Sequence, residues 1–247
     1  MLNELIKNKV YYKIFDRSDH NLTHKYNIHN FEDQIIIDQA KNNIEKVIQS
    51  FDAKNMLLLN QVHGNKVAYI DESKTDFNIW PEADSSVTKI SNIVLAIRTA
   101  DCVPLLFASE DGSVIGSAHC GWRGAKLDLI KIVANNMKQK GASNIVVVIG
   151  PSINQTSYEV SKDFYEDFIN ESKSYQDFFL PSIKANFYMF DLQSFVKRKI
   201  AKENIKIIKH ITDDTYMMAN KYPSYRRSTH TGEAYNQTIL SCIIIKK

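Results

Sequence analysis

Three apolar segments of this chain end in the same way, in a short polar cluster beside a glycine or a proline. They read LLLNQVHGNKV, LAIRTADCVPLLF and VIGSAHCGWRG, and they contain His63, Cys102 and His119 respectively. Short apolar runs of this kind are typical of buried strands. Because strand ends are where loops converge and sites are built in sheet proteins, the pattern predicts that these three side chains meet at one place.

The rest of the chain mixes strand-like and helix-like patterns. Strands are predicted at residues 9–15, 92–101, 113–120, 144–153, 206–210 and 237–245, and helices at residues 38–51, 124–141 and 191–205. The helix over residues 124–141 is predicted to end at Gly141. Its apolar face is predicted to consist of Leu127, Ile130, Val133, Ala134 and Met137.

The order of these segments predicts the fold class. Strand, helix and strand follow one another over residues 113–149, which favours a parallel sheet covered by helices. Segments 55–63 and 66–70 are expected to form a hairpin that turns at Gly64. The sequence has no repeats and no linker rich in Pro, Gly or Ser. We expect an α/β (mixed α+β) fold with mixed β-sheets flanked by helices, in a single domain over residues 1–247.

Charge and hydropathy exclude several function classes. The net charge is +3, and no block of Lys and Arg reaches the length of a nucleic-acid-binding tail. No apolar stretch approaches the roughly 18–20 residues of a membrane helix. The N-terminal segment has scattered charges and lacks the apolar core of a signal peptide. We therefore expect a cytoplasmic protein that binds neither nucleic acid nor membranes, and no obligatory protein partner is evident.

The chain has three cysteines, an odd number that does not suggest a disulfide framework. Cys242 lies in an apolar strand-like run and is expected to be a buried packing residue. Cys120 follows His119 directly, and neighbouring strand residues point to opposite faces. If His119 faces a site, Cys120 is expected to face away from it, unless the strand ends at His119.

Two imidazoles and one thiolate suit zinc, and copper is also chemically possible. Three protein ligands leave one coordination position open, which is typical of a catalytic zinc that activates water. The spacing of His63, Cys102 and His119 is not that of a zinc finger. Each residue alone is also consistent with an ordinary structural role, and the repeated context is what favours a joint metal site.

Further polar residues surround these segments. Asp84 and Asp101 are candidate catalytic bases or groups that orient the histidines, although acidic residues at strand ends often only form turns. Arg123 lies at the start of a predicted helix, where a phosphate or carboxylate would be favoured. Arg226 and Arg227 lie beside Tyr225 and are candidate phosphate-binding residues. The alternatives are a surface cap or ion pair for Arg123 and an exposed basic loop for the pair.

Taken together, NQVHG, EAD, RTADCVPLLF, AHCGWRGA, IGPSI, YEV and SYRR resemble the YfiH family. The family is also called the multicopper polyphenol oxidase or laccase-domain family, and it includes the bacterial peptidoglycan editing factor. The matching motifs run in the family's order from about residue 57 to residue 232. Single motifs are weak evidence, but the ordered set is highly specific.

The resemblance implies a single-domain sheet-and-helix fold and a metal site of two histidines and one cysteine, at His63, Cys102 and His119. Members are described as purine nucleoside enzymes that split adenosine, inosine or methylthioadenosine with phosphate and deaminate adenosine. An older assignment describes them as copper-dependent phenol oxidases. The implied partners are a purine nucleoside and phosphate, and the implied enzyme is a purine nucleoside phosphorylase and adenosine deaminase.

The chain departs from the family pattern at several positions. Cys120 replaces a common alanine, and the pattern around Arg17 is degraded. Glu233 stands where the family has arginine, and Ile211 stands where it usually has cysteine. None of these changes affects the three implied metal ligands.

Other functions stay open at this point. Cys102 would be a nucleophile with His119 as its base in a cysteine hydrolase or amidase. A copper-dependent phenol oxidase would require four-electron reduction of oxygen. A single metal site with two histidines and one cysteine is poorly suited to that reaction. A binding protein for a nucleotide or cell-wall precursor would hold the metal for structural reasons only.

Overall fold

The fold is built on two β-sheets that pack face to face. The computed structural model describes residues 1–19, 34–70, 75–232 and 237–247, and Glu233 lies outside them. The first sheet has the strand order β1 (Asn3–Ile6), β2 (Val10–Phe15), β14 (Ile239–Ile245), β6 (Ile93–Thr99), β3 (Asn55–Leu57). The second has the order β13 (Lys206–His210), β9 (Ile145–Ile149), β7 (Val103–Ser109), β8 (Ile115–Cys120), β5 (Ser85–Thr88), β4 (Val67–Ile70).

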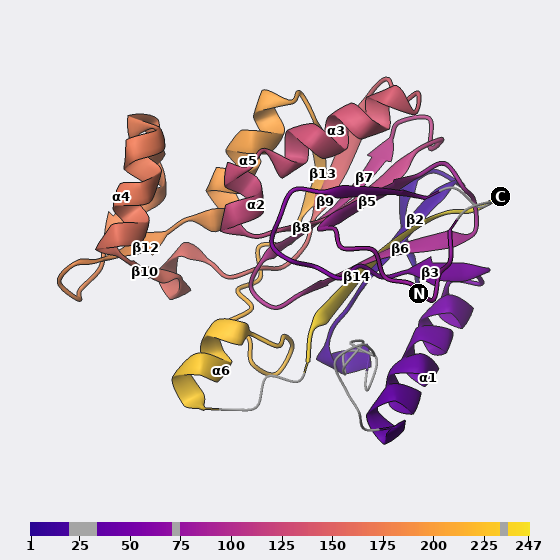
Figure 1. Cartoon of the computed structure of the whole chain (residues 1–247), viewed down its shortest axis with the longest axis horizontal. Helices are drawn as coiled ribbons and strands as arrows, with labels where there is room; N and C mark the ends of the chain where they lie inside the picture. The colour runs from indigo at the N-terminus through magenta and orange to yellow at the C-terminus, as the bar shows by residue number, and fades with distance from the viewer. Residues whose placement is uncertain (20–33, 71–74, 233–236) are drawn as a thin grey trace.

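Helices cover the outer faces of both sheets (Figure 1). Helix α1 (Gln34–Ser50) packs on the five-stranded sheet, where Val47 joins a buried cluster with Phe51 and Cys242. Helices α2 (Trp122–Lys126), α3 (Leu129–Gln139) and α5 (Leu192–Lys202) lie on the six-stranded sheet. The predicted packing role of Cys242 and the mixed α/β fold class are confirmed. Among the described residues, no helix combines the length and apolarity needed to cross a membrane.

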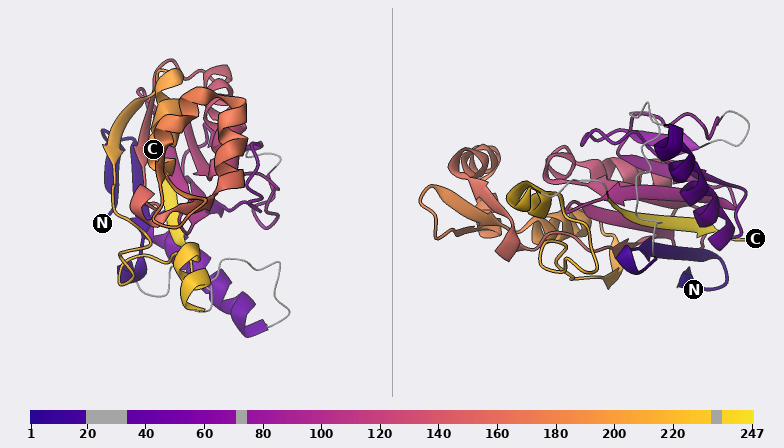
Figure 2. Two further views of the ribbon diagram at one scale, coloured as in Figure 1. Left: turned by 90° about the vertical axis from the view of Figure 1, so that its left-hand side faces the viewer. Right: turned by 90° about the horizontal axis from the view of Figure 1, so that it is seen from below.

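A smaller unit projects from one end of the sandwich (Figure 2). It contains helix α4 (Lys162–Glu171) and a three-stranded antiparallel sheet in the order β10 (Glu159–Ser161), β12 (Phe187–Phe190), β11 (Phe179–Pro181). Short 3-10 helices at Gln155–Ser157 and Lys173–Phe178 flank these elements. Phe168 is fully buried at the centre of an aromatic cluster that joins this unit to α5 through Phe195. Helix α6 (Tyr225–Thr231) follows later in the chain.

The predicted helix over residues 124–141 is broken into α2 and α3. Asp128 adopts a left-handed backbone with φ of 56° at the break, which ends one helix and redirects the next. As a result Leu127 is 44% exposed, so its predicted place on the buried face is wrong. The remaining predicted positions, Ile130, Val133, Ala134 and Met137, are buried, and Gly141 follows the helix with φ of 101°.

The predicted hairpin between segments 55–63 and 66–70 is also wrong. Strand β3 pairs in parallel with β6, whereas β4 pairs in parallel with β5 in the other sheet. The connection therefore crosses from one sheet to the other, and His63 takes the left-handed backbone with φ of 58°. Strands β8 and β9 run in the same direction but do not pair, because β7 lies between them and is antiparallel to both.

The break at Asp128 makes two nearby leucines energetically unequal. Leu129→Ala is expected to lower the free energy of unfolding by about 2–5 kcal/mol, because Leu129 is fully buried. Leu127→Ala is expected to change it by less than about 0.5 kcal/mol. Urea unfolding of both variants checks this, and equal losses would show that the helix continues through Asp128.

Candidate metal centre

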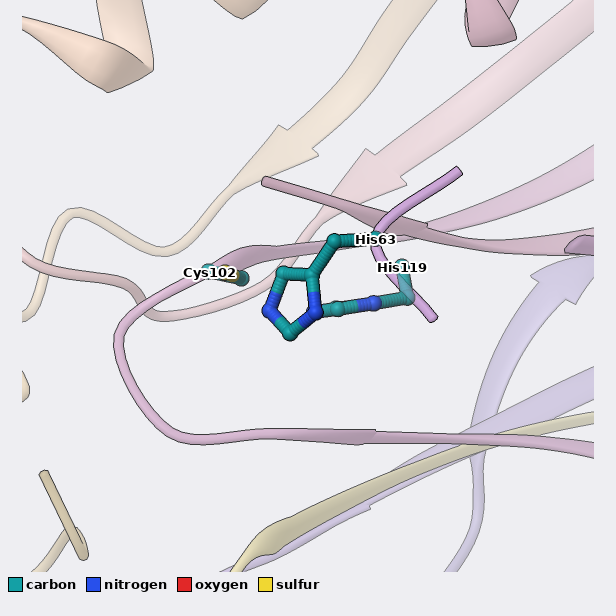
Figure 3. Close-up of side chains that lie close together, drawn as sticks. All are labelled: His63, Cys102 and His119. Atoms are coloured by element: carbon teal, nitrogen blue, oxygen red, sulfur yellow. The ribbon is translucent and has the colours of Figure 1, made fainter. Parts of the chain in front are cut away.

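Three separate connections bring His63, Cys102 and His119 together at one end of the sandwich. His63 lies in the crossing between β3 and β4, and Cys102 lies just before β7. His119 is in β8, paired with Pro104 of β7. Figure 3 shows the three side chains pointing toward one another. The sequence predicted this meeting from strand ends, although His63 lies in a crossover turn beyond its strand and Cys102 precedes one.

The geometry of the cluster suits a metal ion. One ligand atom from each side chain lies within 4.8 Å of the other two. The imidazole rings of His63 and His119 are edge to face, with centroids 4.6 Å apart. Burial increases from exposed His63 through half-buried Cys102 to buried His119. Two imidazoles and one thiolate are ligands typical of zinc, and His63 is exposed to solvent.

Asp84 holds two of these residues in place. Its carboxylate accepts hydrogen bonds from the backbone N–H of His63 at 2.9 Å and of Gly64 at 2.6 Å, with Val62 more distant at 3.2 Å. It also accepts the Nδ1 proton of His119 at 2.8 Å, which leaves Nε2 of that imidazole as the ligand atom. Asp84 is fully buried, and burial alone would raise its pKa, but the hydrogen bonds from His119 and the backbone lower it. The geometry gives Asp84 a positioning role.

The charges of the cluster favour a thiolate at Cys102. Burial alone would raise the pKa of the Cys102 thiol, but charge and hydrogen bonding from His119, and then from His63, lower it to about 7. Burial alone would lower the pKa of His119, but the Cys102 charge and the Asp84 hydrogen bond raise it to about 9. A thiolate–imidazolium pair is the favoured state, and a metal ion that binds Nε2 of His119 would displace the extra imidazolium proton.

Cys120 lies on the opposite face of β8 from His119, as strand alternation predicted. The strand includes both residues, so the alternation holds through Cys120. Cys120 is fully buried in the core with Val103 and Ala125, and burial raises the pKa of its thiol. Cys120 therefore packs beneath α2 and does not join the cluster.

Gly121 is a residue of the centre that the sequence pattern did not single out. A Cβ at this position would lie 3.0 Å from Cys102 Sγ and 3.4 Å from His63 Cδ2. Contacts that close would push the Cys102 and His63 side chains away from their places. The only signal in the sequence was the glycine of the AHCGWRGA motif.

Asp101 precedes Cys102 and connects the Cys102 loop to the C-terminal part of the chain. It has a left-handed backbone with φ of 91°. Its carboxylate accepts hydrogen bonds from Thr215 Oγ1 at 2.6 Å, Ser224 Oγ at 2.9 Å and the Arg226 backbone N–H at 2.7 Å. Both carboxylate oxygens are engaged, so the geometry gives Asp101 a positioning role, like Asp84.

The three arginines predicted to bind phosphate differ in their hydrogen bonds and in their exposure. Arg227 donates from its guanidinium to the carbonyl oxygens of Thr215, Tyr216 and Tyr222, so it fastens the backbone of its own segment. Arg226 donates to the Glu159 carbonyl oxygen from one nitrogen only. Arg123 is exposed in the first turn of α2, one residue beyond Trp122.

Comparisons with known proteins agree with the motifs. A family model described as multi-copper polyphenol oxidoreductase laccase matches residues 15–241. A Rickettsia conorii protein named purine nucleoside phosphorylase is 45% identical over 242 residues, which is 98% of this chain and 99% of that protein. A protein named adenosine deaminase RL5, from an unknown prokaryotic organism, is 32% identical over 125 residues, which is 47% of this chain and 48% of that protein.

Solved structures share the fold. A Neisseria meningitidis protein superposes with a TM-score of 0.82 at 22% identity, covering 100% of this chain and 99% of that one. The Bacillus licheniformis protein YfiH superposes with a TM-score of 0.81 at 21% identity, covering 96% of this chain and 93% of that one. At these identities the likeness concerns the fold alone.

The two neighbouring cysteine positions, Cys102 and Cys120, provide a matched test of the metal centre. Cys102→Ser is expected to weaken zinc binding by more than about 100-fold, beyond the loss that follows removal of a group that only orients a ligand. Cys120→Ala is expected to keep one bound zinc per chain, because its side chain faces the core. Metal analysis after dialysis checks both variants. Equal loss of zinc in folded protein would contradict the assignment.

Metal affinity is expected to fall as the pH falls. His119, with a pKa of about 9, and Cys102, with a pKa of about 7, must both lose their protons for a metal to bind. The affinity is expected to drop about tenfold per pH unit between pH 9 and pH 7, and more steeply below pH 7. Competition with a chelator at several pH values measures this, and an affinity independent of pH would contradict it.

Proposed function

The chain belongs to the family described as multi-copper polyphenol oxidoreductase laccase, and we propose that it is a metal-dependent purine nucleoside enzyme. The observation that carries the proposal is the cluster of His63, Cys102 and His119, with His119 oriented by Asp84. The names of the relatives support the substrate class, purine nucleosides and phosphate. The proposed reactions are phosphorolysis of adenosine, inosine and methylthioadenosine, and deamination of adenosine.

The donor set of the cluster fits zinc, and it also fits copper. Zinc is the proposed metal, and it would supply Lewis acidity toward water or a substrate oxygen at the exposed side of the cluster. His119 would present Nε2, because its other nitrogen donates to Asp84. Cys102 would bind as the thiolate that its neighbours already favour.

The remaining residues would position the reactants. Asp84 would fix the positions of the His119 imidazole and of the turn at His63 relative to each other. Asp101 would hold the Cys102 loop against the C-terminal segment. Phosphate would be bound by an arginine whose N–H groups are not consumed by the fold. Arg227 already uses three N–H groups on carbonyl oxygens, whereas Arg226 uses one and Arg123 is exposed.

A cysteine hydrolase or amidase is the second candidate, because the lowered pKa of Cys102 and the raised pKa of His119 favour a thiolate–imidazolium pair. Zinc dependence separates the two. A metal enzyme loses its activity when zinc is removed and regains it when zinc is added. A cysteine nucleophile is inactivated by thiol alkylation of the metal-free protein.

The proposed activity is tested by incubating zinc-loaded protein with adenosine and phosphate. Phosphorolysis gives adenine and ribose 1-phosphate, while hydrolytic deamination gives inosine and ammonia. His119→Ala is expected to reduce both products to background because it removes a metal ligand. Cys120→Ala is expected to stay within a few-fold of the unmodified protein, because Cys120 lies in the core. Zinc-loaded protein that yields none of these products would overturn the proposal.

A further inference from the structure

Tyr158 is a half-buried residue that the proposed function does not yet use. It lies directly before β10, in the smaller unit. The guanidinium of Arg226 lies over its ring, 5.1 Å from the centroid. Burial and then the charge of Cys102 raise the pKa of the phenol, whereas Arg226 lowers it. Tyr158 therefore keeps its proton, and its hydroxyl can donate a hydrogen bond.

A chain of contacts links Tyr158 to the Cys102 loop on one side. Asp101 accepts the backbone N–H of Arg226 at 2.7 Å, which fixes the start of α6 beside Cys102. The Arg226 side chain then reaches the smaller unit, where Nη1 donates to the carbonyl oxygen of Glu159 at 2.6 Å. Arg226 thus spans the distance from the metal loop to Tyr158.

A second path reaches Tyr158 through aromatic rings. Trp122 follows Gly121, the residue that abuts Cys102 and His63. The Trp122 ring is edge to face with Phe164 at 5.0 Å, and Phe164 lies 6.5 Å from Tyr158. All three aromatic side chains are half-buried. Of these three aromatic residues, only Tyr158 carries a hydroxyl group.

The two adjacent arginines have different amounts of hydrogen-bonding capacity left. Arg227 uses two guanidinium nitrogens on three carbonyl oxygens. Within the described residues, the Arg226 guanidinium forms no ion pair and donates only from Nη1, which leaves its Nε and Nη2 groups available there. A guanidinium with N–H groups to spare suits a phosphate, because two of its N–H groups can donate parallel hydrogen bonds to two phosphate oxygens.

We propose that Arg226 and Tyr158 together form the phosphate-binding site, with the Arg226 guanidinium donating to two phosphate oxygens and the Tyr158 hydroxyl donating to a third. This inference rests on the proposed function, since it places the phosphate of the phosphorolysis beside the metal centre. Asp101 does not compete with the phosphate for donors, because both its oxygens are already engaged. The pair thereby determines whether a bound nucleoside meets phosphate or water.

The test compares Arg226→Gln and Tyr158→Phe with Arg227→Gln, the matched change at the neighbouring position. Binding of inorganic phosphate to the zinc-loaded protein is measured by titration calorimetry, with zinc content and urea midpoint recorded for each variant. We expect Arg226→Gln and Tyr158→Phe each to weaken phosphate binding by about 10- to 100-fold, since each removes hydrogen bonds to a charged ligand. Arg227→Gln is expected to lower the urea midpoint without that loss. If it does not fold, Arg227→Lys replaces it.

Product ratios give a second readout. Deamination consumes water and not phosphate, so Arg226→Gln and Tyr158→Phe are expected to lower phosphorolysis relative to deamination. The site is supported if the unmodified protein binds phosphate and both variants lose that binding. This holds even if no nucleoside is turned over, because a lack of turnover would contradict only the proposed function. The site is overturned if the unmodified protein binds no phosphate, or if both variants bind it normally. Loss in Arg123→Gln alone would likewise overturn it.

Discussion

The carboxylate of Asp84 is the group on which the candidate metal centre depends. It is buried at the start of β5, where an unpaired charge would be very costly, and hydrogen bonds from three backbone N–H groups and one imidazole offset that cost. Three of the four donors belong to the crossing between the two sheets. The fourth belongs to β8. One side chain therefore joins a turn with a left-handed residue, His63, to the strand that carries His119.

Asp101 makes the equivalent connection on the other side of the cluster. Its left-handed backbone would be unfavourable for aspartate in isolation, and three hydrogen bonds from the C-terminal part of the chain hold it there. Cys102 is consequently fixed by residues more than a hundred positions away in the sequence. The cluster is thus assembled from long-range contacts. Its three side chains can come together only when the whole sandwich has folded.

Sequence patterns predicted the parts of this structure that depend on local chemistry. Apolar runs identified β6, β8, β9 and β14, and strand alternation correctly separated His119 from Cys120. The hairpin at Gly64 was wrong because a local turn signal says nothing about which sheet each arm joins. The break at Asp128 was missed because the apolar period continues across it. For the hairpin, the strands that decide the structure are β6 and β5, which pair with β3 and β4.

Two pairs of adjacent residues show which features a sequence pattern can predict and which depend on the tertiary structure. His119 and Cys120 take different roles because strand geometry forces neighbours to opposite faces, a rule that needs no tertiary information. Arg226 and Arg227 also take different roles, but nothing in the pair itself distinguishes them. Three N–H groups of the Arg227 guanidinium donate to carbonyl oxygens of its own segment, whereas the Arg226 guanidinium uses one and lies over the Tyr158 ring. The capacity of an arginine to bind a ligand is set by which of its N–H groups the fold leaves unused.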